Sequence, residues 1–170
     1  GHIPPGPPIE RFETWIPSLA HDRKMVVEDR VPQARIYRTW PSPEWGNPAS
    51  DLLEVVGLSL GEGTTSRLYQ RLVYQEQIAT DAGTYAMADE IAGGFLIWAT
   101  AREGENLEKI NSIIQEEVEI FLEKGPTPDE LLRAKTSIRS DFIRTIERVT
   151  GKASVLAENT VFCISPSLYI

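Results

Sequence analysis

The sequence predicts an α+β fold, in which a mixed or antiparallel sheet has its helices packed on one face. Apolar and polar residues alternate in two pairs of short segments, as they do in half-buried strands. Each pair is followed by segments with the caps and apolar spacing of helices, which gives the order ββ, αα, ββ, αα, α. No glycine-rich turn of the dinucleotide-binding type and no internal repeat occurs. This order favours segregation of the helices to one face of the sheet.

Length and composition are those of one folded domain. The chain has 170 residues, of which 41% are hydrophobic and 25% are charged, so we expect a hydrophobic core of ordinary size. The formal net charge of −8 argues against a nucleic-acid partner, because phosphate binding depends on clustered Lys and Arg. No run approaches the roughly 18–20 apolar residues of a membrane-spanning helix, so no membrane segment is expected in this chain.

The first 17 residues are rich in proline, which predicts an extended linker over residues 1–17. Residues 18–170 are then expected to form a single domain that is truncated at its C-terminus. The chain begins at Gly1 without an initiator Met and stops at Ile170 soon after an apolar stretch. We therefore expect it to be a piece of a longer polypeptide, and the lack of a targeting signal says nothing of the compartment.

The first pair of strands is expected on either side of Pro32. Alternating residues predict one strand over residues 25–28 and a second over residues 34–40. Pro41 and Pro43 are expected to close the second strand, because proline donates no hydrogen bond to a sheet.

The first helix is expected to begin at Asn47, which can cap it, with Pro48 in its first turn and Gly61 after its end. Its apolar residues surround the helix almost completely, which predicts burial on more than one side. These residues are Leu52, Leu53, Val55, Val56, Leu58 and Leu60.

A shorter helix is expected over residues 66–75, with Thr64 or Thr65 as its cap. Its inward-facing residues are Leu68, Leu72 and Val73. The turn at residues 61–66 has the composition of a phosphate-binding loop, but it lacks the Gly-Lys-Ser/Thr ending and follows a helix. A turn between helices, with glycine for flexibility and threonine for capping, is therefore preferred.

The second pair of strands is expected over residues 78–88 and 95–100, joined by a turn at residues 89–94 and therefore antiparallel. An amphipathic helix is expected over residues 106–124, with its end at Gly125.

The strongest local signal is a capping box. Thr127 can accept a hydrogen bond from the backbone of Glu130, whose side chain can return one, and Pro128 suits the first helical position. The long helix that follows carries one apolar stripe, formed by Leu131, Ala134, Ile138, Phe142, Ile146 and Val149. One more helix is expected after Gly151.

The chain lacks the pattern of a catalytic zinc site, which needs about three protein ligands. Its two histidines, His2 and His21, lie in no His-x-x-Glu-His pattern or its reverse, so both are expected to be solvated. Cys163 is expected to pack as a small hydrophobe, and no Gly-x-Ser-x-Gly elbow occurs. The four tryptophans are spread along the chain and are expected to pack in the core or an interface: Trp15, Trp40, Trp45 and Trp98. We expect no catalytic, cofactor-binding or metal-binding residue.

Residues 60–73 read Leu-Gly-Glu-Gly-Thr-Thr-Ser-Arg-Leu-Tyr-Gln-Arg-Leu-Val. This segment resembles the Leu-Gly-x-Gly-x-x-Ser-Arg-Leu-Phe-x-x-x-Arg segment in the non-zinc domains of insulinase/pitrilysin-type zinc peptidases. Three other stretches agree in order and spacing: residues 37–41, the helix entry at 125–131, and Ala134 with Lys135. The resemblance spans residues 24–162.

The resemblance implies that the zinc site lies in a preceding domain and that both domains enclose a chamber for unfolded peptide. Active members also supply, from a later non-zinc domain, an Arg and a Tyr seven residues apart that bind substrate. Aligned on residues 66–68, this chain has Val73 and Thr80 at those two positions, and neither replaces the original donor. Arg67 and Tyr69 stand at positions that look structural. Tyr74 and Tyr85 are near but out of register.

We therefore expect a non-catalytic second domain of a zinc metallopeptidase, with the catalytic domain of the same polypeptide and a peptide substrate as its partners. This chain alone would be inactive and would hold no cofactor, while zinc is expected in the preceding domain. The alternative is a peptidase-like scaffold or assembly protein without proteolytic activity, as in the core subunits of respiratory complexes. A periplasmic or secreted bacterial location is compatible with the family.

Overall fold

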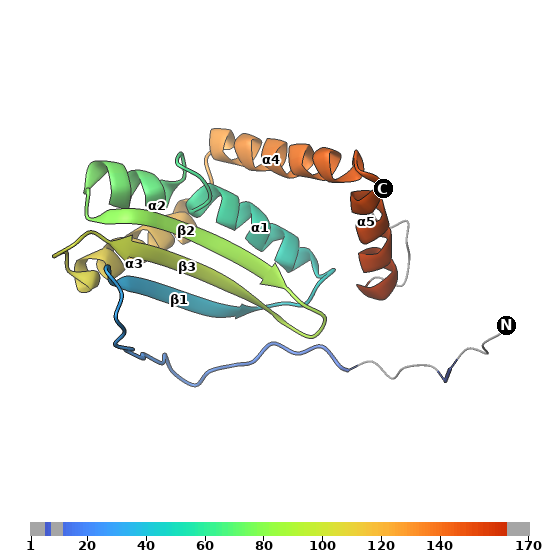
Figure 1. Cartoon of the computed structure of the whole chain (residues 1–170), viewed down its shortest axis with the longest axis horizontal. Coiled ribbons are helices and arrows are strands. Elements are labelled where there is room, and N and C mark those ends of the chain that lie inside the picture. The colour runs from blue at the N-terminus through green and yellow to red at the C-terminus, as the bar shows by residue number, and fades with distance from the viewer. Residues whose placement is uncertain (1–5, 8–11, 163–170) are drawn as a thin grey trace.

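The computed structural model describes residues 6–7 and 12–162. Its sheet consists of β1 (Arg35–Ser42), β2 (Ala79–Ala88) and β3 (Gly93–Ala101), in the spatial order β1-β3-β2. Both strand pairs are antiparallel, so the predicted hairpin of β2 and β3 is confirmed. The predicted α+β class is likewise confirmed, with an antiparallel sheet (Figure 1).

The helices are α1 (Pro48–Leu60), α2 (Arg67–Tyr69), the π-helical η1 (Gln70–Gln75), α3 (Leu107–Lys124), α4 (Pro128–Ile146) and α5 (Val149–Phe162). Two predicted caps, at Asn47 and Thr127, are confirmed, and Asn106 provides a third that was not predicted. The Asn47 side chain accepts from the backbone of Ala49, the Asn106 side chain accepts from that of Glu108, and the capping box at the start of α4 is complete.

One face of the sheet packs on helices and forms the core. On β3, Phe95, Ile97 and Ala99 are buried, while the residues between them point to the opposite face, as the pleat of a strand requires. The core cluster joins these residues to helical ones, including Leu68 and Ile110, each with no exposed surface. Figure 1 shows α3 behind the sheet and α1 and α2 along its β2 side.

The strand predicted over residues 25–28 does not form, because the segment has no neighbour for a ladder within the described part of the chain. Met25 and Val26 are 85% and 79% exposed. The end of β1 was also predicted too early, since the strand includes Pro41 and runs to Ser42. An edge strand tolerates proline where its N–H would face away from the neighbouring strand.

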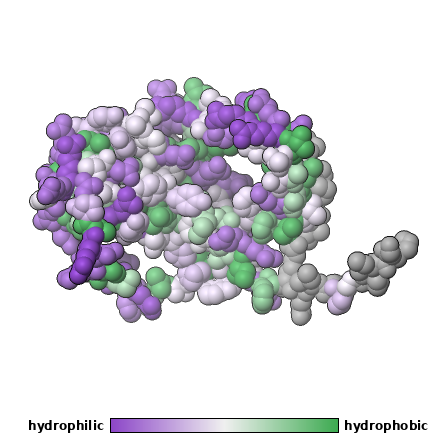
Figure 2. Space-filling view, viewed as in Figure 1, coloured by the Kyte–Doolittle hydropathy of each residue, from purple (hydrophilic) through white to green (hydrophobic). Residues whose placement is uncertain are grey.

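The predicted burial of α1 on more than one side is confirmed only in part: the helix contacts both β2 and α4, but it is not buried along its whole length. Its buried residues, Gly57, Ser59 and Leu60, lie in its last turn, whereas Leu52 is 66% exposed. The apolar stripe of α4 is buried near its start, at Ala134, but Phe142 is 36% exposed. Figure 2 shows an opening in the visible surface between α4 and the body of the molecule, beside α5.

The short helix after α1 is continuous through residues 67–75 but changes from α to π geometry at Gln70. Its cap is Ser66 and not Thr64 or Thr65, because the chain turns one residue later than expected. The last helix begins at Val149, two residues before Gly151, which therefore lies inside α5.

Candidate functional site

Residues 60–73, on which the resemblance mainly rests, run from the end of α1 through a turn into α2 and η1. The turn is closed by hydrogen bonds to two carbonyl groups. The backbone N–H groups of Gly61 and Glu62 donate to Gly57 O at 2.9 and 3.1 Å. The Ser66 hydroxyl donates to Gly63 O at 2.7 Å and is buried. The turn thus uses its polar groups to hold its own conformation.

Two glycines in this turn are required for different reasons. A Cβ at Gly61 would lie 2.7 Å from the backbone nitrogen of Thr84 on β2, so only glycine allows this approach. Gly63 has open space around it but a φ of +77°, which side chains other than hydrogen rarely allow. The Thr84 hydroxyl donates to Gly57 O at 2.8 Å and joins β2 to α1.

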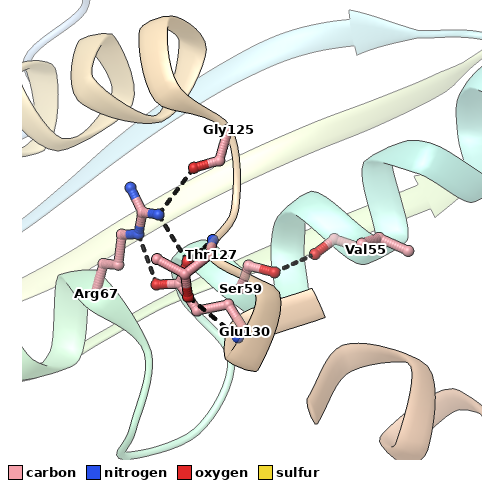
Figure 3. Close-up of polar contacts among 6 residues, drawn as sticks. All are labelled: Val55, Ser59, Arg67, Gly125, Thr127 and Glu130. Carbon is pink, nitrogen blue, oxygen red and sulfur yellow. Dashed lines mark hydrogen bonds and ion pairs between the residues drawn. The ribbon is translucent and has the colours of Figure 1, made fainter. Parts of the chain in front are cut away.

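Arg67, directly after the turn, forms an ion pair with Glu130 at the start of α4 (Figure 3). Its Nε donates to Oε1 at 2.7 Å and its Nη2 donates to Oε2 at 2.6 Å, while Nη2 also donates to Gly125 O at 3.0 Å. Both side chains are largely buried, with 16% and 11% of their surfaces exposed. The guanidinium also lies over the ring of Phe121, 4.9 Å from its centre.

The same carboxylate completes the capping box of α4. Glu130 Oε2 accepts from the backbone N–H of Thr127 at 2.7 Å, and the Thr127 hydroxyl accepts from the backbone N–H of Glu130 at 3.2 Å. Hydrogen bonds from Arg67 lower the pKa of Glu130 to about 2, against the opposing effect of burial. The hydrogen bond to Glu130 raises the pKa of Arg67. Arg67 therefore has a structural role, since its Nε and Nη2 donate within the fold.

Arg71 ties η1 to α3 through several carboxylates. Its guanidinium lies 3.3 Å from Glu76, 3.6 Å from Glu116 and 3.5 Å from Glu117. The Glu117 side chain is the most buried of the three, with 12% of its surface exposed. This second arginine of the segment is also engaged in tertiary contacts.

The two positions where the resemblance places substrate-binding residues have different surroundings. Val73 is half-buried and packs against the core. Thr80 is exposed, and its hydroxyl donates to Thr100 O at 3.4 Å. Tyr74 is 54% exposed and packs on Tyr69.

A cavity of about 190 Å³ lies between the glycine turn and β2. Its lining includes residues 61–64 of the turn, Tyr69, residues 81–84 of β2 and Trp98. Trp98 lies over Gly83, where a Cβ would come within 2.8 Å of its ring. Its indole N–H donates to Asp81 Oδ2 at 3.0 Å.

The face of the sheet opposite the helices carries aromatic side chains in open positions. Tyr37 pairs with Trp98 across β1 and β3, and both Tyr37 and Tyr85 are 57% exposed. Arg35 Nε donates to the Thr100 hydroxyl at 2.7 Å. We call this surface the open sheet face: Arg35, Tyr37, Thr39, Asp81, Gly83, Tyr85, Met87, Leu96, Trp98 and Thr100. Sequence reasoning missed it, although strand alternation in the hairpin could have identified its members.

Within residues 6–7 and 12–162, no three His, Cys, Asp or Glu side chains gather in a group that could hold a metal ion. His21 is exposed. His2 and Cys163 lie outside the described residues. Trp15, Trp40 and Trp45 are 62%, 36% and 40% exposed, although Trp40 packs on the core residue Phe95 and Trp45 packs on Phe162. No helix in the described part of the chain is long and apolar enough to cross a membrane.

Comparison with known proteins gives a matching family model and similar folds. Residues 1–138 match the family model described as the peptidase M16 inactive domain. A Rickettsia felis protein described as an uncharacterized zinc protease is 27% identical over 106 residues, which cover 62% of this chain. A protease from Helicobacter pylori has a similar fold, with a TM-score of 0.73 and 24% identity over 80% of this chain.

A chain of the Candida albicans complex III dimer has a similar fold too, with a TM-score of 0.66 and 17% identity over 79% of this chain. The present chain covers only part of each relative: 25% of the Rickettsia protein, 33% of the Helicobacter chain and 34% of the Candida chain.

Proposed function

Because this chain belongs to the peptidase M16 inactive-domain family, we propose that it forms a non-catalytic wall of the substrate chamber of a zinc-dependent metalloendopeptidase. The zinc ion would be held by a preceding domain of the same polypeptide, and the substrate would be an unfolded peptide. This chain would position the catalytic domain and contact the peptide without taking part in bond cleavage.

The observation that carries this proposal is the one-sided sheet. Helices cover one face, whereas the open sheet face exposes Tyr37 and Tyr85 beside the half-buried Trp98. In Figure 2 this face carries pale and apolar residues, while hydrophilic ones dominate the surrounding helices. Exposed tyrosines contribute strongly to binding because they bury a large area with few rotatable bonds.

The residues at and after the 60–73 segment support a structural role for the domain. Arg67 is engaged with Glu130, and Val73 and Thr80 stand where active members have an Arg and a Tyr. Val73 has no donor for a substrate carbonyl group near the zinc, and the Thr80 hydroxyl is too short to replace a phenol. A binding surface without catalytic groups is what a chamber wall requires.

Peptide binding by the chain tests the proposal. We expect a fluorescently labelled unstructured peptide, rich in apolar residues, to bind weakly in an anisotropy titration. Tyr37→Ala and Tyr85→Ala should each weaken the affinity about fivefold or more, if each side chain contributes at least about 1 kcal/mol. Tyr74→Ala is the matched control, because Tyr74 is similarly exposed, at 54%, but belongs to η1.

The alternative is a peptidase-like scaffold that assembles with other subunits and binds no substrate. The fold shared with the Candida complex III chain is compatible with it. Absence of peptide binding, or equal effects of the three tyrosine substitutions, would contradict a role for the open sheet face and favour this alternative.

A further inference from the structure

Trp98 on β3 lies flat on the open sheet face, over its cross-strand neighbour Gly83 on β2. A Cβ at Gly83 would lie closest to Cζ2 of the indole, and 2.8 and 2.9 Å from Cη2 and Cε2, the two ring atoms bonded to it. Three adjacent ring atoms at such similar distances mean that the face of the indole, and not its edge, covers this position. Glycine therefore allows the ring to lie down, since any other side chain would lift it off the sheet.

Asp81 fixes the ring in this position through a hydrogen bond. The indole N–H, which can only donate, donates to Asp81 Oδ2 at 3.0 Å. Asp81 and Gly83 are two residues apart on β2, so both lie on the same face of the strand. The carboxylate limits how far the ring can turn, and the glycine determines how closely it approaches the sheet. The orientation of the indole is thus set before any ligand binds.

The indole held in this way is accessible to a ligand. Trp98 is half-buried, and one face of its ring covers β2. It also lines the cavity of about 190 Å³ between the glycine turn and β2, so a group that enters this cavity reaches the ring. Aromatic rings pack on one another in offset-stacked or edge-to-face arrangements, and a ring that is already fixed loses little freedom on binding.

The charges beside the indole favour an uncharged ligand. Arg35 Nη2 lies 4.0 Å from Asp81 Oδ2. The same guanidinium donates from Nη1 to the Tyr37 hydroxyl at 3.3 Å and lies 5.9 Å from the centre of the tyrosine ring. A cationic ligand would therefore meet Arg35, and an anionic one would meet Asp81. A neutral aromatic side chain avoids both repulsions and packs on the face of the indole.

We propose that Trp98 is the anchor for an aromatic side chain of the bound peptide, and that Asp81 and Gly83 are the positioning residues that hold its indole ready. The proposal rests on the proposed function, because it takes an unfolded peptide as the ligand of the open sheet face. It adds a preference for phenylalanine, tyrosine or tryptophan in that peptide. The structural alternative is that Trp98 only covers Gly83, which would stabilise the sheet without selecting a ligand.

A pair of labelled peptides tests the preference. Both are unstructured, carry aliphatic residues and differ only at one central position, which is phenylalanine in one and cyclohexylalanine in the other. The second residue has a similar size, but its ring is not aromatic. In anisotropy titrations the chain should bind the phenylalanine peptide about three- to tenfold more tightly, as expected for one pair of packed aromatic rings. Trp98→Leu should bind both peptides equally.

Further variants separate positioning from packing. Asp81→Ala releases the indole and Gly83→Ala lifts it from the sheet, so both should lose the preference although Trp98 is retained. Asp81→Asn removes the same charge as Asp81→Ala but should keep the preference, because its amide oxygen can accept the indole N–H. Gly94→Ala is the matched control for the glycine, since a Cβ there would meet only the Trp40 carbonyl oxygen, at 3.9 Å.

NMR measures the positioning without any peptide. The indole N–H resonance of Trp98, assigned through its loss in Trp98→Leu, should shift and exchange faster with solvent in Asp81→Ala but not in Gly94→Ala. Equal binding of the two peptides, or a preference that survives in both Asp81→Ala and Gly83→Ala, would overturn this proposal and leave peptide binding itself intact. Binding of neither peptide would contradict the proposed function as well.

Discussion

Arg67 and Glu130 join the start of α2 to the start of α4 across 63 residues of sequence, through hydrogen bonds of 2.7 and 2.6 Å. The same carboxylate caps α4, so one side chain determines both where this helix begins and what it packs against. Arg67 therefore stabilises the packing of two distant helices of the domain.

Removal of the arginine should destabilise the domain. Arg67→Ala leaves a largely buried carboxylate without its main partner, which should lower the free energy of unfolding by about 2–3 kcal/mol. Arg67→Lys should recover only part of this loss, because an ammonium group cannot form both hydrogen bonds in the same geometry. Urea denaturation measures the difference.

Arg139→Ala is the control for this substitution. Arg139 is exposed on α4, and its replacement should change stability by less than about 0.5 kcal/mol. If both substitutions lowered the free energy of unfolding equally, the ion pair would contribute no more to stability than any exposed positive charge does.

The ion pair between Arg67 and Glu130 could not be predicted from the sequence. The capping role of Glu130 and a structural position for Arg67 were both expected, but not the contact between them. Asn47 and Thr127 act within a few residues of themselves, so local spacing predicted both caps. A contact across 63 residues has no local signature.

The strands also show that local contacts could be predicted from the sequence and long-range contacts could not. The hairpin of β2 and β3 was predicted because its turn is local, whereas the sequence did not indicate that β1 pairs with β3. Residues 25–28 have strand composition but no ladder, because composition cannot supply a neighbour. The exposure of Leu52 on α1 likewise depends on which elements pack around the helix.

Acid should remove the contribution of the ion pair. The pKa of Glu130 is about 2 in the folded chain and near 4.5 when unperturbed, so the folded state favours the carboxylate. Its stabilising effect is therefore complete above about pH 4.5 and is lost as the pH falls toward 2, up to about 3 kcal/mol in all.

The measurement is the difference in unfolding free energy between the chain and its Glu130→Gln variant, from pH 6 down to the acid limit of folding. Subtraction removes the common effect of the other carboxylates. A difference that stays constant below pH 4.5 would contradict the role of the ionised carboxylate.

Gly61 and Gly63 should respond differently to alanine. Gly61→Ala places a Cβ 2.7 Å from a backbone atom of Thr84, which cannot move without displacing β2, so we expect a loss of about 2–3 kcal/mol. Gly63→Ala meets no neighbour and suffers only from its φ of +77°, which should cost about 1 kcal/mol. Urea denaturation of both variants checks the order, and an equal loss would contradict the steric requirement for glycine at position 61.

Introducing the Arg and the Tyr that the resemblance implies for active members should not make this chain a peptidase. Thr80→Tyr should be tolerated, because Thr80 is exposed. Val73→Arg should lower stability by about 1–3 kcal/mol, since Val73 packs against the core and a charge there loses its hydration.

Neither variant, nor the two together, should cleave peptides when zinc is added, because substrate binding cannot replace the ion that activates the attacking water. Elemental analysis should find no stoichiometric zinc in any of these proteins. One tightly bound zinc per chain, or zinc-dependent cleavage by the double variant, would show that the chain carries its own metal centre and overturn its assignment as a chamber wall.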